Sequence, residues 1–215
     1  MKKLIIFIAT LFVYMSTMAK VTVTNVLRTI PKEIVPYIDD DRRDEIGRFS
    51  SENDSLEIKN SLNGTMRIWT VSDDFARMEL SESSMLQVKL LSTGDTTQII
   101  CVVKTITSPV AESEVRFYTV GWNELDGDFG LPDMRDAGAM LSSLTVRPDT
   151  MAEARYGELL KNIEPVIVNA SFDAKAEVLT LGLGIPFTTK QVQNDMKAII
   201  KQKSFKWNGK TFRLC

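Results

Sequence analysis

Apolar and polar residues alternate through much of the segment from Leu56 to Trp122, and this alternation predicts an antiparallel β-meander. Asn63-Gly64 interrupts the alternation with a residue pair typical of a tight hairpin turn, because both turn residues must reach positive φ. About six strands are expected, which is an ordinary number for a sheet. They are Leu56–Leu62, a strand through Met66 and Ile68, Phe75–Ser81, Met85–Leu91, Gln98–Val103 and Val115–Thr119.

Two of these strands differ in how their two faces are composed. Met85–Leu91 places Gln87 and Lys89 opposite its apolar face, which predicts that one side of the sheet meets water. Gln98–Val103 is apolar on both faces, and such a strand is expected in the middle of a sheet that is covered on both sides.

The residues before the meander predict a short strand over Val21–Asn25 and two short helices over Pro31–Phe49, divided near Pro36. The triplet Asp39–Asp41 suits the start of the second helix, because carboxylates at a helix N-terminus accept hydrogen bonds from free amides and complement the dipole.

The residues after the meander predict a smaller set of elements. Thr150 and Glu153 have the spacing of a capping box, and Thr188 with Gln191 repeats that spacing before a second, longer helix. A second Asn-Gly pair, at residues 208 and 209, predicts a terminal hairpin. The expected elements are a helix in Pro132–Leu144, a helix after Thr150, strands Pro165–Phe172 and Glu177–Leu183, helix Phe187–Lys203, and the hairpin Ser204–Leu214.

Helices and strands are segregated along the chain, which indicates the α+β class. The expected architecture is an antiparallel β-meander with N-terminal helices, followed by a smaller helix, two-strand, helix and hairpin region. The corresponding boundaries are 1–19 for a leader, 20–122 for the helices and meander, and 123–215 for the smaller region, which is either a separate domain or continuous with the first.

The first nineteen residues have the pattern of a secretory signal peptide. Lys2-Lys3 precede an apolar run from Leu4 to Tyr14, and Thr17–Ala19 supplies a small-x-small cleavage site. The apolar run is short for a membrane span, and no later segment is apolar enough to cross a bilayer. We therefore expect a soluble protein located in the periplasm, at the cell surface or outside the cell, with Lys20 as its first residue.

Charge excludes some partners and leaves others open. The chain holds 26 basic and 28 acidic residues, and this balance argues against nucleic-acid binding. Basic residues predominate from Lys190 to Cys215, which suggests either an anionic partner or a solvated helix face. The second interpretation is favoured, because these lysines do not form a block of like charge.

The absence of histidine excludes His-based triads, His general bases and His metal ligands. What remains is carboxylate chemistry of the glycosidase type, which needs two acids flanking a cleft. The stretch Asp126-Gly127-Asp128-Phe129-Gly130 also resembles half of a calcium loop, but a Gly/Asp turn is favoured because the third ligand and the final Glu are missing. No cofactor or metal is expected. The candidate acids are Asp73, Asp74, Asp126, Asp128 and Asp133.

The two cysteines, Cys101 and Cys215, decide the question of a disulfide. Export permits one. However, Cys101 lies in the most apolar strand, where a buried free thiol is common, and Cys215 is at a chain end, where fraying is expected. Free thiols are therefore the favoured prediction.

Several short stretches together resemble a family of exported proteins of unknown function from gut-type Bacteroidetes. The resemblance implies a periplasmic or surface location, and it carries no activity, ligand or catalytic residue to this chain. The matching stretches are Ile30-Pro31 through Pro36-Tyr37, Arg43–Ile46, Ile58–Asn60 with Gly64, Leu80-Ser81 with Ser84, Lys89–Leu91, Phe117-Tyr118 with Trp122, and Trp207–Lys210.

Two functions remain open from the sequence. The first is a non-catalytic envelope protein that binds an envelope protein or a glycan through the sheet or through a groove between the two regions. The second is a carbohydrate-active hydrolase that uses two carboxylates. A deep pocket surrounded by Asp126, Asp128 and Asp133 would favour the hydrolase, whereas a shallow apolar groove without paired acids would favour binding.

Overall fold

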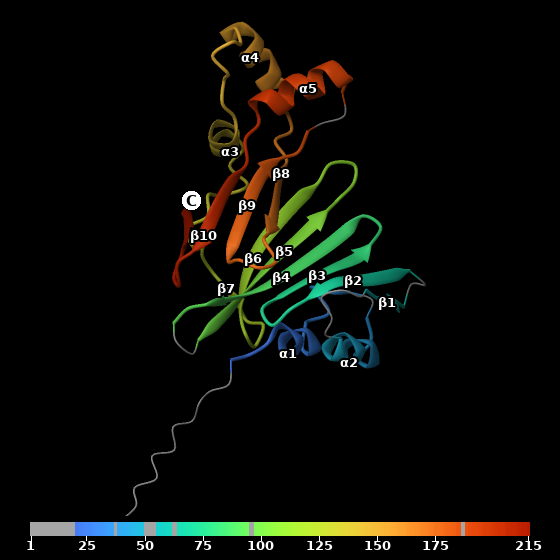
Figure 1. The fold of residues 1–215 in the computed structure, drawn as a ribbon. Coiled ribbons are helices and arrows are strands. Elements are labelled where there is room, and N and C mark those ends of the chain that lie inside the picture. Colours follow the sequence, from blue (N-terminus) through green and yellow to red (C-terminus); the bar gives the residue numbers. More distant parts are fainter. Residues whose placement is uncertain (1–19, 37, 50–54, 62–63, 95–96, 186–187) are drawn as a thin grey trace, which may run out of the picture.

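The structure is a computed structural model, and it describes residues 20–36, 38–49, 55–61, 64–94, 97–185 and 188–215. These residues form two antiparallel sheets and five helices, joined by loops, so the protein is of the α+β class. The larger sheet follows chain order from β1 to β7, as expected for a meander, and the smaller sheet has the order β11-β10-β9-β8. In Figure 1 the N-terminal helices and the smaller sheet lie on different sides of the larger sheet.

The helices are α1 (Val23–Arg28), α2 (Asp40–Arg48), α3 (Ala137–Leu144), α4 (Glu153–Lys161) and α5 (Lys190–Ile199). The larger sheet contains β1 (Leu56–Lys59), β2 (Thr65–Val71), β3 (Phe75–Ser81), β4 (Ser84–Ser92), β5 (Gln98–Ile106), β6 (Glu112–Thr119) and β7 (Glu124–Leu125). The smaller sheet contains β8 (Val168–Phe172), β9 (Val178–Leu183), β10 (Lys203–Trp207) and β11 (Phe212–Leu214).

Strand β5 separates two hydrophobic cores, because its successive side chains point to opposite faces of the sheet. Ile100 and Val102 pack in the core beneath α1 and α2, whereas Cys101 and Val103 pack in the core shared with the smaller sheet. This confirms the expectation that the strand is central and covered twice. The second core combines side chains from both regions of the chain, including Phe117 from the meander and several from β8–β11.

The prediction that Gln87 and Lys89 face water is wrong, because both side chains are buried between the two sheets. The side-chain carbonyl of Gln87 accepts a hydrogen bond from the backbone amide of Phe172, in edge strand β8, at 2.8 Å. The Lys89 ammonium lies 3.0 Å from the Asp74 carboxylate and donates to the Ala174 backbone carbonyl at 3.3 Å. Polar side chains on the larger sheet therefore satisfy backbone groups of β8 and of the turn that follows it, and alternation alone cannot distinguish this use from exposure to water.

The N-terminal segment is helical where a short strand was expected. Helix α1 begins after Thr22, whose backbone amide donates to the Asn25 side chain at 3.1 Å. Val23, Val26 and Leu27 then lie on one buried face, a spacing that fits a helical turn better than an extended chain. Two helices were expected over residues 31–49, whereas the described residues of this span form one, α2, and Asp39 begins it by accepting a hydrogen bond from the Arg42 amide at 2.9 Å.

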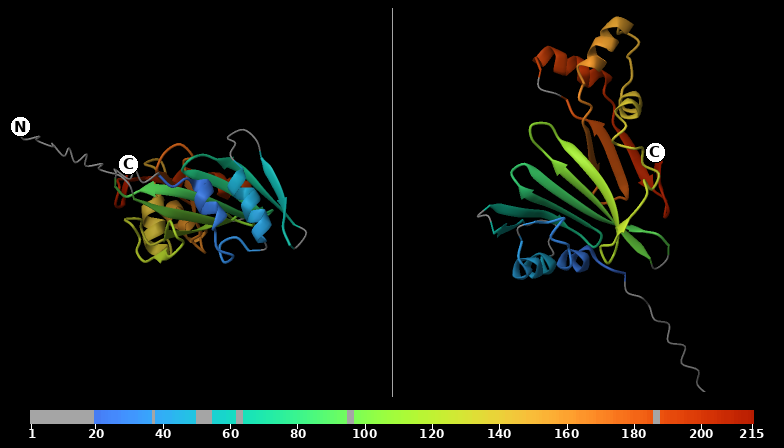
Figure 2. Two further views of the ribbon diagram at one scale, coloured as in Figure 1. Left: turned by 90° about the horizontal axis from the view of Figure 1, so that it is seen from below. Right: turned by 180° about the vertical axis from the view of Figure 1, so that it is seen from behind.

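The elements of the smaller region exist close to where they were expected, although helix boundaries differ: α5 ends at Ile199, and Lys203, expected in that helix, begins β10. Helix α4 begins at Glu153 without a side-chain cap from Thr150, and α5 begins after Thr189 rather than Thr188. The hairpin of β10 and β11 pairs Phe205 with Leu214. Figure 2 shows α3, α4 and α5 gathered beyond one end of the smaller sheet. Asn63 and Phe187, which were expected in a turn and in a helix start, lie outside the described residues.

Candidate functional site

Two cavities are candidates for a functional site. The first, here called the Asp128 cavity, has a volume of about 370 Å³ and lies where the loop after β7 passes α3 and the β10–β11 hairpin. The second, here called the Trp122 cleft, has a volume of about 480 Å³ and lies between the loop after α1 and strands β5–β7.

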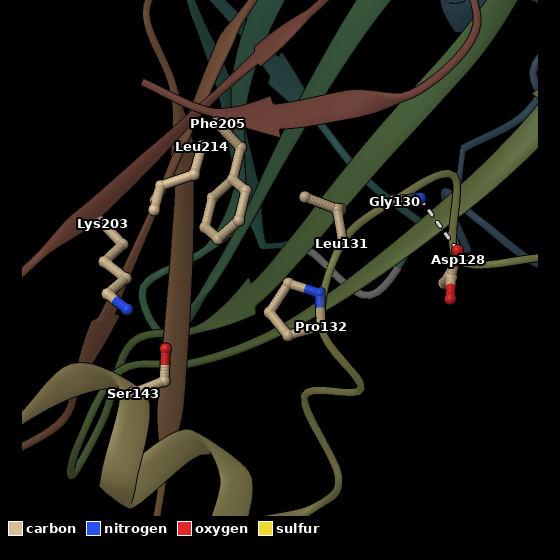
Figure 3. Close-up of a pocket in the computed structure, with 8 residues that line it drawn as sticks. All are labelled: Asp128, Gly130, Leu131, Pro132, Ser143, Lys203, Phe205 and Leu214. Atoms are coloured by element: carbon tan, nitrogen blue, oxygen red, sulfur yellow. Dashed lines mark hydrogen bonds between the residues drawn. The ribbon is translucent and has the colours of Figure 1, made fainter.

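The Asp128 cavity has apolar side chains at its centre and few polar groups. In Figure 3, Phe205, Leu131 and Pro132 occupy the middle, whereas Asp128 lies on the side opposite Lys203. The Asp128 carboxylate accepts a hydrogen bond from the Gly130 backbone amide at 2.8 Å, which holds the loop in a tight turn. The carboxylate therefore has a local structural role.

The other candidate acids are not brought into that cavity. Asp126 and Asp133 are not among the residues that line it, and Asp133 accepts a hydrogen bond from the Arg135 backbone amide at 2.9 Å. Asp74 is the partner of buried Lys89, and Asp73 accepts the Val23 amide through its backbone carbonyl. Within the described parts of the chain, no group of three or more acids or cysteines is arranged to hold a metal ion.

The Trp122 cleft has one wall that is fixed by a buried arginine. The guanidinium of Arg43, on α2, donates to the backbone carbonyls of Ile30 and Ile38, which bracket the loop after α1. This clamp positions Pro31 and Ile34, whose side chains line the cleft. Strands β5 and β6 supply the opposite wall, so the cleft joins segments that are about 70 to 90 residues apart in the chain.

Two aromatic side chains lie next to each other in the cleft. The ring centroids of Tyr118 and Trp122 are 5.6 Å apart, with an interplanar angle of 58°. Trp122 has a φ of 65°, a left-handed conformation that costs a bulky residue about 1–3 kcal/mol. Its indole N–H donates to the Val26 carbonyl at 3.0 Å, which ties the turn between β6 and β7 to helix α1. The surrounding fold thus holds a tryptophan at a turn position that more often carries glycine or asparagine.

Charged side chains from the sheet and from the loop after α1 form the rim of the Trp122 cleft. The Arg116 guanidinium donates to Glu114 at 2.7 Å through one terminal nitrogen and to Glu124 at 3.1 Å through the other. Lys104 lies directly across from Glu114 in the β5–β6 register, and Glu33 completes the rim from the loop after α1.

Burial is the largest cause that raises the pKa of the Tyr118 hydroxyl, and the negative charge of Glu124 raises that pKa further, whereas Arg116 opposes the change. The tyrosine therefore stays neutral at physiological pH. Its hydroxyl experiences the field of a rim carboxylate, although about half of the Glu124 side chain is exposed.

The sequence did not single out this cleft as a site. In the sequence, Phe117-Tyr118 and Trp122 are distinguished only by the family resemblance, which assigns them no role. The available signal was the face of β6 opposite Phe117, where Glu114, Arg116 and Tyr118 recur at every second position. Alternation places them together, but only the folded loop after α1 turns that face into a cleft.

Residues 14–212 match the family described as "Protein of unknown function (DUF3256)", and the chain belongs to this family. Among solved structures, the chain is similar to one titled "Structure of a domain of an uncharacterized protein from Porphyromonas gingivalis W83". The TM-score is 0.73 and the identity 19%, over 88% of this chain and 97% of that chain, so the likeness shows the fold alone. No curated protein matches the chain. None of the helices within the described ranges is long and apolar enough to cross a membrane.

These comparisons confirm the part of the resemblance that concerns a family of unknown function with a relative in the Bacteroidetes. Export is not tested by them and stays a prediction.

Proposed function

We propose that the protein is an exported, non-catalytic binding protein of the cell envelope, and that its ligand enters the Trp122 cleft. The observation that carries this proposal is the strained Trp122 beside Tyr118 in a cleft of about 480 Å³. Ligand sites are concave, span about 300–1,000 Å³ and combine apolar or aromatic walls with a few fixed polar groups. Backbone strain in a bulky residue also concentrates at functional sites, where the surrounding structure maintains it.

The apolar surface of the cleft is contributed by both walls. Val102 and Tyr118 come from the sheet, and Pro31 and Ile34 come from the loop that Arg43 holds. Because the walls are tied together by the indole bond to Val26, the cleft is preformed, and a ligand would not have to order it.

The alternative, a hydrolase that uses two carboxylates, has less support. Glu114 and Glu124 do share one cleft, but each is more than half exposed and each is bound by Arg116. A glycosidase requires one carboxyl group that carries a proton at working pH, and such groups are usually buried away from positive charge. The Asp128 cavity is lined by only one acid, whose carboxylate holds the loop backbone.

Nuclear magnetic resonance of ¹⁵N-labelled protein, titrated with oligosaccharides and peptides released from the native envelope, tests the proposal. We expect the indole N–H signal of Trp122 to shift, together with amides of residues 31–34 and 114–124. Trp122→Phe assigns that signal, because the protein has three tryptophans. Shifts confined to the Asp128 cavity, or hydrolysis of a glycan during the titration, would contradict the proposal.

Export is tested separately, by mass spectrometry of protein recovered from the envelope. We expect a chain that begins at Lys20. A chain that retains Met1 would remove the periplasmic or surface location from the proposal, while leaving the ligand-binding part to be judged by the titration.

A further inference from the structure

Acidic residues outnumber basic residues around the Trp122 cleft, and this imbalance affects which ligands the cleft can bind. Three acids and two bases line it, and Arg116 is already shared between Glu114 and Glu124. An approaching anion would meet three carboxylates, a guanidinium whose terminal nitrogens already donate to acids, and the Lys104 ammonium, which lies across from Glu114. An approaching cation would meet Glu33 and the outer oxygens of the other two carboxylates.

The aromatic pair in the cleft also favours a cation over an anion. Aromatic faces carry negative electrostatic potential, and a cation within about 6 Å of a ring centroid is attracted to it. Tyr118 and Trp122 meet at an inclined angle, so they form a corner rather than a flat stack. The negative charge of Glu124 also reaches this corner, because it is one of the causes that raise the pKa of the Tyr118 hydroxyl.

The apolar part of the cleft suits a long aliphatic stem. Ile34 and Val102 are buried, yet they line the cleft beside charged residues. Lysine and arginine bury their methylene stems along apolar surfaces while their charged heads reach polar groups. A stem on Ile34 and Val102 would place a charged head near the aromatic corner and the rim acids.

On the basis of the proposed function, we infer that the Trp122 cleft binds a lysine or arginine side chain presented by a basic segment of a partner polypeptide. The charge excess of the rim, the aromatic corner and the apolar floor each match a different part of such a side chain. The chain thus recognises a cation on an aliphatic stem, and recognition depends on ionic strength because the rim is open to solvent.

The test uses two peptides that differ only in charge. Tetralysine amide is titrated into the labelled protein, and the matched peptide in which all four side chains are Nε-acetylated is titrated in parallel. We expect tetralysine to shift the indole N–H signal of Trp122 and the acetylated peptide to leave it unchanged. Raising the salt concentration should weaken the tetralysine effect.

Two variants compare a cleft acid with an acid elsewhere on the same sheet. Glu124→Gln should weaken tetralysine binding about two- to fivefold, the range expected for loss of one exposed ion pair. Glu57→Gln is the control, because Glu57 is similarly exposed and also pairs with an arginine, Arg67, but does not line the cleft. It should leave tetralysine binding unchanged.

Other outcomes overturn the inference in distinguishable ways. Equal shifts with both peptides would show that charge is not recognised. A tetramer of glucosamine that binds where tetralysine does not would replace the polypeptide with an amino sugar, and a neutral tetramer of N-acetylglucosamine bound in the cleft would overturn the preference for cations. Each of these leaves the proposed binding function intact, whereas a Trp122 signal unmoved by the whole envelope panel and by every probe contradicts that function itself.

Discussion

Removing the carboxylate of Asp74 should destabilise the protein more than removing the charge of its partner, Lys89. The reason is the difference in their burial. The Lys89 side chain is fully buried, whereas 36% of the Asp74 side chain is exposed. In Asp74→Ala the buried ammonium stays between the sheets without its counter-ion, and leaving a buried charge uncompensated costs about 3–5 kcal/mol.

Lys89→Met keeps an apolar stem of similar length between the sheets and leaves Asp74 free to bind water. Its main cost is the lost hydrogen bond to the Ala174 carbonyl, about 1–2 kcal/mol. The double variant should have nearly the stability of Lys89→Met alone, because the ammonium that Asp74→Ala strands is then gone. Ser72→Ala is the control for Asp74→Ala, since the Ser72 hydroxyl lies 3.1 Å from the same carboxylate, and it should cost about 1 kcal/mol.

Urea unfolding followed by far-ultraviolet circular dichroism measures these free energies of unfolding, provided that the slope with denaturant is unchanged among variants. If Lys89→Met were as destabilising as Asp74→Ala, the argument from unequal burial would be refuted. If the effects of the two single substitutions simply added in the double variant, the two groups would not interact.

Three further predictions concern the smaller region, the thiols and metal binding. Ile199→Ala should lower the free energy of unfolding by about 2–5 kcal/mol, because Ile199 is fully buried, while exposed Lys197→Ala should change it by less than about 0.5 kcal/mol. Equal urea midpoints for the two variants would mean that Ile199 is not packed in the core. Iodoacetamide should alkylate exposed Cys215 in the native protein and spare Cys101. Burial blocks access to the Cys101 thiol and raises its pKa well above the usual value. Mass spectrometry that shows both thiols modified before unfolding would contradict this prediction. Adding EDTA should leave the melting temperature unchanged, and a fall of several degrees would instead support a cation at the Asp126 loop.

Local patterns were sufficient to predict most elements of this fold, because each one depends on contacts within a few residues. The Asn208-Gly209 turn is an example: the Asn208 side chain accepts the amides of Lys210 and Thr211, and Gly209 has a φ of 95°. The start of α2 at Asp39 depends on the same kind of local hydrogen bond. The continuous apolar run of β5 likewise predicted a central strand covered on both sides, since its side chains must point to both faces.

Candidate sites were harder to predict from the sequence, because their partners are distant along the chain. Asp74 was singled out as an acid, but its role depends on Lys89. Lys89 is buried only because the smaller sheet packs against the larger one. Asp128 was singled out as well, and it lines a cavity without a second acid. Trp122 carried no signal of its own, because a left-handed turn residue is identified by its backbone angle and not by its type.

The sequence by itself determined the class of the protein, the order of most of its elements, the terminal Asn-Gly turn and the absence of histidine chemistry. These follow from periodicity, capping and composition, which involve only neighbours in the chain. The tertiary structure decided which polar residues are buried, how the smaller sheet covers the larger one, and where a cleft forms. Those features arise because Arg43 fixes the loop after α1 and because the edge of β8 uses Gln87 as a hydrogen-bond partner. Such contacts join residues far apart in the chain, so no local pattern specifies them.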